Sequence, residues 1–166
     1  MLLLLIGISF ATTTVTGCGY LNVSGETFIL TSNLVILSSN CLQIIAPNVV
    51  LDCQGYNMGA NSGFKYSVYV AADGATIKNC DFQGASSVAD APIQIIYAGT
   101  NVIIDRINFT KHNSVGSPFI WANATTGLTV SNSIFTSSCP GGCGTVKSIY
   151  ITENMTNVKI QNNTFG

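Results

Sequence analysis

The chain has 166 residues, of which 47% are apolar and only 8% are charged, and its formal net charge at pH 7 is −1. That length suits a single domain. With so few Lys and Arg residues, the chain has no cluster of positive charge that could bind phosphate groups. Nucleic acid is therefore not an expected partner.

Residues 1–17 are the first predicted element, a secretory signal peptide. An apolar run from Leu2 to Phe10 is followed by small residues, although the usual basic start is missing. The run is shorter than the ~20 residues that a membrane-spanning helix needs. Two alternatives stay open: a buried first strand or helix, and a bacterial lipobox at residues 15–18, in which Cys18 would be lipidated. Together with six cysteines, this segment predicts a secreted or cell-surface protein.

Residues 18–40 precede a series of repeats, described next, that predicts a solenoid. The terminal coils of a solenoid must be covered, so this segment is predicted to form an N-terminal cap. In this segment Phe28 and Leu30 are expected to face inward. The same orientation is expected for Val35 and Leu37.

From residue 41 onward, one pattern of about a dozen residues returns five times. Each copy ends a strand on an apolar anchor residue, and successive anchors are 26, 27, 26 and 30 residues apart: Leu51, Ile77, Ile104, Val130 and Ile160. A second apolar residue stands two positions earlier, which is typical of a strand with one buried face. An aromatic residue stands five positions after every anchor, at Tyr56, Phe82, Phe109, Phe135 and Phe165.

A second strand precedes each copy. Its expected inward pairs are Leu42/Ile44, Val68/Val70, Ile93/Ile95, Phe119/Trp121 and Ile149/Ile151, and its outward residues are Gln43, Tyr69, Gln94, Ile120 and Tyr150. Two-residue Asn-Gly hairpin loops are absent, which disfavours a sandwich. A coil of about 26 residues with short strands predicts an all-β fold, a parallel β-helix solenoid of about five coils over residues 41–166. The aromatic residues would then stack in the core, one rung of about 4.8 Å apart.

The second residue after each anchor is interpreted as a corner of the coil. These residues are Cys53, Asn79, Arg106, Asn132 and Asn162. Asparagine tolerates the left-handed conformation that a corner requires. Stacked in register, the asparagine side chains would form a hydrogen-bonded ladder.

A set of spaced residues also carries a resemblance to a known family. They are Cys18-Gly19, Phe28, Leu30, Cys41, Ile44, Ala46, Asn48-Val49, Leu51-Asp52-Cys53, Gly55 and Ile77-Lys78-Asn79-Cys80. Over about residues 18–166 the chain resembles the pectin-lyase-like superfamily, especially its secreted or cell-surface members. The resemblance implies a right-handed parallel β-helix. The superfamily includes polysaccharide lyases, glycoside hydrolases and surface proteins with no known catalytic activity. The resemblance therefore implies one of these functions, and fold alone does not decide among them.

The weak catalytic candidates are Asp52, Lys78, Asp105 and Arg106. The first three fall in one outward column on successive coils. A lyase acting on acidic glycans would use the carboxylates for Ca²⁺ and Lys78 or Arg106 as the base. The other interpretation is a surface ladder of charges that stabilises the stack, in which a lysine between two carboxylates stays protonated. Enzyme activity is therefore the alternative, and no cofactor is expected beyond Ca²⁺ under that alternative.

The main functional prediction is a polysaccharide-binding or structural module at the cell surface. Its predicted glycan-binding residues are Gln43, Tyr69, Gln94 and Tyr150. Aromatic faces accept the C–H side of sugar rings, and amides hydrogen-bond to hydroxyl groups. The other interpretation of the tyrosines is that they are ordinary strand residues on a half-exposed face. The expected partners are polysaccharides or other cell-envelope components.

Three disulfides are predicted from the cysteine positions. Cys53 and Cys80 are one coil plus one residue apart and would bridge neighbouring coils, if their Cα atoms come within ~7 Å. Cys18 and Cys41 would tie the N-terminal segment to the first coil, and Cys139 and Cys143 would close a small loop. Metal binding is the other interpretation of the last pair, and no metal site is expected.

The chain stops at Gly166, just after the fifth aromatic residue. An uncovered last coil would leave open strand edges. The sequence therefore predicts further coils beyond Gly166 in a longer protein, or end-to-end association with a second copy.

Overall fold

The computed structural model describes residues 12–36, 40–60, 66–83, 93–95, 100–110, 118–123, 126–136, 147–152 and 155–166. The expected signal segment covers residues 1–17, of which residues 1–11 lie outside these ranges, as do Leu37, Cys139 and Cys143, whereas Thr12–Val15 form a strand. Every element in the described ranges is a strand. None of those ranges holds a helix with the length and apolar character that crossing a bilayer requires.

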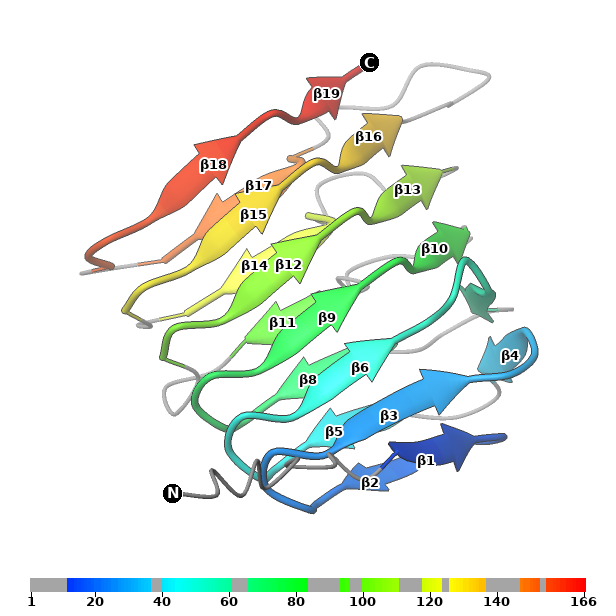
Figure 1. Cartoon of the computed structure of the whole chain (residues 1–166). Coiled ribbons are helices and arrows are strands. Elements are labelled where there is room, and N and C mark those ends of the chain that lie inside the picture. Colours follow the sequence, from blue (N-terminus) through cyan, green and yellow to red (C-terminus); the bar gives the residue numbers. More distant parts are fainter. Residues whose placement is uncertain are drawn as a thin grey trace, which may run out of the picture.

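The described strands form three parallel sheets (Figure 1). Sheet A consists of β1 (Thr12–Val15), β3 (Thr27–Leu30), β6 (Val50–Asp52), β9 (Thr76–Lys78), β12 (Ile103–Asp105), β15 (Thr129–Ser131) and β18 (Lys159–Gln161). Sheet B consists of β2 (Gly19–Leu21), β5 (Leu42–Ile44), β8 (Val68–Val70), β11 (Ile93–Ile95), β14 (Ile120–Ala122) and β17 (Ile149–Ile151). Sheet C consists of β4 (Leu34–Ile36), β7 (Asn57–Ala60), β10 (Asp81–Gln83), β13 (Asn108–Thr110), β16 (Ile134–Thr136) and β19 (Thr164–Phe165).

Each coil takes one strand from sheet B, one from sheet A and one from sheet C, and the coils rise from β2 at one end to β19 at the other (Figure 1). The predicted right-handed parallel β-helix is confirmed. The five anchors stand in one register: Leu51 pairs with Ile77, and the pairing continues through Ile104, Val130 and Ile160. Residues 18–40, expected as a cap, supply β2, β3 and β4, so they add one strand to each sheet.

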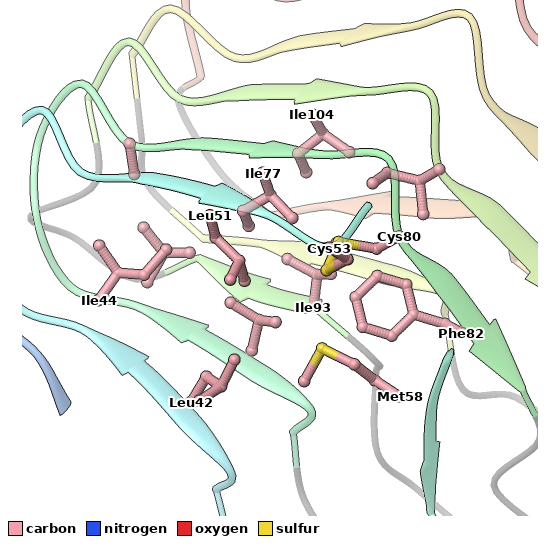
Figure 2. Packing of buried hydrophobic residues seen from close by; sticks show 14 of the residues in the cluster. Leu42, Ile44, Leu51, Cys53, Met58, Ile77, Cys80, Phe82, Ile93 and Ile104 are labelled. Atoms are coloured by element: carbon pink, nitrogen blue, oxygen red, sulfur yellow. A yellow bond between two sulfur atoms is a disulfide. The ribbon is translucent and has the colours of Figure 1, made fainter. Parts of the chain in front are cut away.

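The interior is apolar along the length of the solenoid. Figure 2 shows Leu42 and Ile44 of sheet B pointing toward Leu51 and Ile77 of sheet A, with Met58 of sheet C beside them. All five side chains are at most 1% exposed. Burying a side chain of this size contributes about 1.5–3 kcal/mol. In the last coil the equivalent positions are open, and Ile160 and Phe165 are exposed.

The predicted aromatic column is confirmed for its four phenylalanines. The rings of Phe82, Phe109, Phe135 and Phe165 stack with centroids 5.4, 4.8 and 5.0 Å apart and with interplanar angles of 10–17°. Such offset stacks add about 0.5–1.5 kcal/mol per pair beyond the area that they bury.

The fifth aromatic residue, Tyr56, is not in this column. Met58 pairs with Phe82 instead, and Tyr56 is exposed. The corner of that coil has two left-handed residues, Gln54 and Gly55, where the next coil turns at Asn79 alone. The longer corner moves the column position two residues along the chain.

The orientation of β14 was predicted one residue out of register. Ile120 and Ala122 face the core, and Trp121 faces outward in register with Gln94. Phe119 is buried all the same, because its ring packs 5.2 Å from that of Phe109.

The same one-residue error affects the predicted orientation of β4. Leu34 and Ile36 are buried and Val35 is exposed, whereas the predicted inward positions of Phe28 and Leu30 are confirmed.

The turn from sheet B to sheet A has a left-handed residue in every coil, and glycine alternates with asparagine there: Gly25, Asn48, Gly74, Asn101, Gly127 and Asn157. The side-chain oxygen of Asn48 lies so close over Gly74 that a methyl group on the glycine would overlap it. Asn101 lies over Gly127 in the same way. At this turn the repeating unit is therefore a pair of coils.

Replacing Gly74 with alanine is expected to lower the free energy of unfolding by about 2 kcal/mol. About half comes from a left-handed backbone at a residue with a Cβ atom, and the rest comes from overlap with Asn48. Gly25→Ala is the matched control, because its backbone is also left-handed but no atom lies within 4 Å of the added carbon. Urea unfolding should show the larger loss for Gly74→Ala, and adding Asn48→Gly should recover the difference. Equal losses at both glycines would show that the asparagine contact is unimportant.

Candidate functional site

The middle residues of the sheet B strands stand in one register along the solenoid axis, and this line of positions is here called the outer file. By strand register its members are Tyr20, Gln43, Tyr69, Gln94, Trp121 and Tyr150. The structure therefore places the four predicted glycan-binding residues in one column. Ile120, predicted to lie in that column, is replaced by Trp121, and Tyr20 joins it.

The exposed aromatic surface of the outer file is largest at its two ends. Tyr20 is 62% exposed and Tyr150 36%, while Gln43, Tyr69 and Trp121 are partly exposed. Neighbouring strands of a sheet are about 4.8 Å apart, so a ligand lying along the axis would contact several members at once.

Neighbouring side chains contact three of the aromatic rings in the file, those of Tyr69, Trp121 and Tyr150. The Tyr150 ring meets the Trp121 ring edge-on, with centroids 6.2 Å apart and planes at 67°. The ammonium nitrogen of Lys147 lies 4.2 Å from the centroid of the Tyr150 ring, a cation–π contact. Tyr69 packs against Tyr66 at 6.1 Å. The rings are thus held in place by neighbours.

The outer file can stack against a ligand and hydrogen-bond to it. Its six members are tyrosine, tryptophan or glutamine, and none is Asp, Glu, Lys, Arg or His. The indole nitrogen of Trp121 is shielded from solvent and has no hydrogen-bond partner. An unmet buried donor of this kind costs roughly 1–3 kcal/mol, and an acceptor that reached it would recover that cost.

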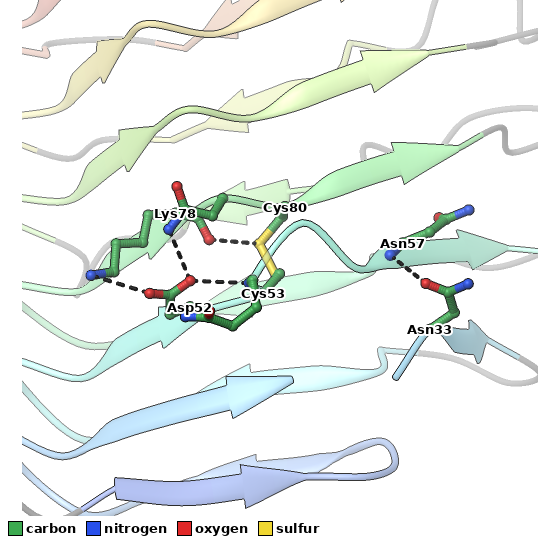
Figure 3. Close-up of a disulfide and its surroundings, with 8 residues drawn as sticks. Asn33, Asp52, Cys53, Asn57, Lys78 and Cys80 are labelled. Carbon is green, nitrogen blue, oxygen red and sulfur yellow. Dashed lines mark hydrogen bonds and ion pairs between the residues drawn. A yellow bond between two sulfur atoms is a disulfide. The ribbon is translucent and has the colours of Figure 1, made fainter. Parts of the chain in front are cut away.

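The four catalytic candidates lie together on sheet A and at its corner with sheet C. Asp52, Lys78 and Asp105 share one column on β6, β9 and β12, as predicted. Lys78 forms an ion pair with Asp52 at 3.3 Å (Figure 3). Asp105 pairs instead with the adjacent Arg106, whose guanidinium lies 3.0 Å away. The charges are therefore matched in separate pairs.

The two carboxylates hold the corners of the next coils. Asn79 donates a side-chain hydrogen bond of 2.9 Å to Asp52, and Asn132 donates one of 2.7 Å to Asp105. The backbone N–H of Gln54 also donates to Asp52 at 3.0 Å. Instead of the expected ladder of asparagines, each of these two asparagines donates to an aspartate of the preceding coil, and Arg106 donates from Nε to the side-chain oxygen of Asn79 at 2.8 Å. Asn79, Arg106, Asn132 and Asn162 are left-handed as predicted, but Cys53 is not, because Gln54 takes that conformation in its coil.

These hydrogen bonds keep both aspartates ionised. Burial raises the pKa of Asp52, but hydrogen bonds from Asn79 and Gln54 and the charge of Lys78 outweigh it and lower the pKa below 3.8. Burial likewise raises the pKa of Asp105, and Asn132, Ser131 and Arg106 together lower it below the same value. A carboxylate stabilised in this way is a poor proton donor near neutral pH, so the arrangement favours a structural role.

Replacing Asp52 with asparagine is expected to reduce stability at neutral pH but not in acid. A lowered pKa in the folded state means that the aspartate stabilises the fold fully above 3.8 and loses this effect as pH falls through the lowered value. Urea unfolding of wild type and Asp52→Asn at about pH 6 and about pH 3 should show a difference that shrinks in acid. A difference that is constant between the two pH values would contradict the assignment.

Two of the three predicted disulfides are present. Cys53 and Cys80 join neighbouring coils with Cα atoms 4.8 Å apart, next to the Asp52–Lys78 pair (Figure 3). Cys18 and Cys41 join the first two coils with Cα atoms 4.5 Å apart. Both pairs satisfy the geometric limit for a disulfide.

A shallow pocket of about 520 Å³ lies beside the Cys53–Cys80 bridge. It is lined by Gln54, Gly55, Asn79, Cys80, Asp81, Arg106 and Asn108. Asp81 accepts a hydrogen bond from Gln83 through one carboxylate oxygen, and its other oxygen has no partner. In the described ranges no three His, Cys, Asp or Glu side chains come together as a metal-binding group.

Sequence reasoning missed two members of the outer file, for different reasons. Tyr20 was assigned to a cap, although "GYL" at residues 19–21 can be aligned with "LQI" at 42–44. Trp121 stands in "PFIWA", where every residue is apolar and alternation provides no signal.

Comparison with protein-family models, with curated proteins and with solved structures finds no match for this chain. The fold is therefore established by the strand pairing itself.

Proposed function

We propose that this solenoid is an extracellular or cell-surface module that binds polysaccharide along the outer file of sheet B. The observation that carries the proposal is the strand register, which aligns three tyrosines, one tryptophan and two glutamines at equivalent positions of successive strands. Binding would add to the structural role of the solenoid and would involve no covalent chemistry.

The side chains of the file suit a carbohydrate better than a nucleic acid. Aromatic rings stack on the C–H faces of sugars, and glutamine amides donate to and accept from hydroxyl groups. A nucleic-acid ligand would require several cations for its phosphates. Among the described residues, Lys147 is the one cation that contacts a member of the file, and it lies over the ring of Tyr150.

The disulfides support an extracellular or cell-surface location. Bridges such as Cys18–Cys41 and Cys53–Cys80 form and persist in oxidising compartments and are rare in the cytosol. The low charge of the chain and the apolar segment at residues 2–10 agree with export.

Replacing Tyr69 or Trp121 with alanine is expected to weaken polysaccharide binding about tenfold, because each change removes one aromatic ring on which a sugar stacks. A tenfold change in affinity corresponds to about 1.4 kcal/mol of binding free energy. Affinity electrophoresis in gels containing hydroxyethyl cellulose, mannan, xylan, laminarin or polygalacturonate measures the effect.

The matched control is Tyr56→Ala, an exposed tyrosine that lies at the corner between sheets A and C and not in the file. It should bind like the wild type. Retardation by none of the five polysaccharides, or equal losses in the control and the file variants, would refute the proposed function. Thermal unfolding of each variant confirms that the fold is intact.

A further inference from the structure

The order of side chains along the outer file narrows the class of glycan. Aromatic residues occupy β2, β8 and β14, and glutamines occupy the strands between them, β5 and β11. Aromatic side chains thus recur every second coil from Tyr20 through Tyr69 to Trp121. Two coils correspond to about 9.6 Å, twice the spacing of neighbouring strands.

From this period we infer that the ligand is a neutral, extended β-1,4-linked glycan lying along the solenoid axis, with one disaccharide unit for every two coils. The inference rests on the proposed function and specifies its ligand. In such a chain each pyranose ring advances by close to one rung and is turned over relative to the ring before it. The same type of ring face therefore recurs at every second sugar, which matches the spacing of the aromatic side chains.

A glutamine fits the intervening sugar. Gln43 stands in register between Tyr20 and Tyr69, and the strand between those of Tyr69 and Trp121 also has no aromatic residue at this position. An amide provides two donor hydrogens and an acceptor oxygen, so it pairs with the equatorial hydroxyl groups and ring oxygens of a turned-over sugar. A helically coiled glycan, such as an α-1,4-linked chain, would not present its faces with this two-coil period.

The charge distribution favours a neutral glycan over a uronate polymer. No member of the outer file is Asp, Glu, Lys, Arg or His. The charged pairs Asp52–Lys78 and Asp105–Arg106 belong to sheet A and its corner, away from the strands that carry the file. Lys147 is engaged on the ring of Tyr150. A polyanion would therefore find few charge-assisted contacts along the file.

Tyr150 marks the end of the binding track. It follows Trp121 directly, breaks the alternation, and turns its ring edge-on to the indole. The alternating track therefore runs from Tyr20 to Trp121, four rung steps or roughly 19 Å. With about one sugar for each rung, the track accommodates an oligosaccharide of about five residues.

Isothermal titration with oligosaccharides tests the inference on the full chain. The probes are cello- and manno-oligosaccharides of increasing length, maltohexaose, laminarihexaose and hexagalacturonate. The affinity for the first two series should rise with length to about five residues and then level off. They should bind at least tenfold more tightly than maltohexaose, laminarihexaose or the acidic hexamer.

The decisive variant exchanges two members of the file, Gln43→Tyr together with Tyr69→Gln. It keeps the composition of the face but destroys the two-coil spacing, so binding of cellohexaose should fall at least tenfold. Tyr56→Ala should leave it unchanged.

The outcomes separate the inference from the proposed function. If maltohexaose or hexagalacturonate binds as tightly as cellohexaose, with the same dependence on Tyr69 and Trp121, the inference fails while the proposed function stands. If the exchanged variant binds cellohexaose like the wild type, the spacing argument fails. If no probe binds, or no file variant matters, both fail.

Discussion

Replacing Phe109 with alanine is expected to lower the free energy of unfolding by about 3–5 kcal/mol, the usual loss for a large aromatic residue in a closed core. Phe109 is fully buried. Its ring lies 5.4 Å from Phe82, 4.8 Å from Phe135 and 5.2 Å from Phe119. Removing it interrupts the stack in the middle and leaves a cavity that parallel strands fixed in register on both sides cannot close.

Urea unfolding followed by far-ultraviolet circular dichroism measures this loss. Phe165→Ala is the matched control in the same column, because Phe165 is 54% exposed and, among the residues that the structure describes, stacks on one ring, that of Phe135. We expect it to lose less than about 1.5 kcal/mol, the contribution of one aromatic pair. A Phe109 variant no less stable than the Phe165 variant would show that the column does not hold the coils together.

Removing the Cys53–Cys80 bridge by a double alanine substitution is expected to lower the free energy of unfolding by about 3–4 kcal/mol. The bridge closes a loop of 27 residues, for which the chain-entropy treatment gives a value of this size. Both cysteines are also buried in the core, at 0% and 2% exposure, so the smaller alanines remove packing as well.

The Cys18–Cys41 bridge is the matched comparison, since its sequence separation of 23 residues gives nearly the same loop entropy. Cys18 is exposed, so its removal leaves no cavity on that side. The double variant at 53 and 80 should therefore be the less stable of the two in urea unfolding. The opposite order would mean that packing around the buried bridge contributes little.

The coil and its register could be predicted from sequence wherever a strand has a polar residue next to its buried anchor. In "VLD", "TIK" and "IID" an aspartate or lysine follows the anchor, so Leu51, Ile77 and Ile104 were aligned correctly. Burial then follows from the two-residue period of a strand.

The prediction of which residues face the core was wrong where both faces of a strand are apolar. "LVI" at 34–36 and "FIWA" at 119–122 contain no polar residue, so either set of side chains fits an inward position. The choice is decided by the neighbouring coils, which pair Ile120 with Ile93 and Leu34 with Met58. In such a strand, pairing with the neighbouring coils determines the register, and the local sequence does not.

The candidate site was only partly predictable for the same reason. Gln43, Tyr69 and Tyr150 are flanked by inward aliphatic residues, and their place in the outer file was correctly anticipated. Trp121 depended on the ambiguous parity of β14. Tyr56 was misplaced because a corner lengthened by Gln54 and Gly55 changes the chain length between two strands without changing their alternation.

The alternation of glycine and asparagine at the turn between sheets B and A limits how the chain can change its length in evolution. Deleting the single coil that contains Gly74 would set Asn48 against Asn101, with a Cβ atom where the amide needs room. Deleting the coils of Gly74 and Asn101 together would bring Asn48 over Gly127 and restore the original fit. Coils in this solenoid should therefore be gained and lost in pairs, and variants that gain or lose an odd number of coils should be selected against.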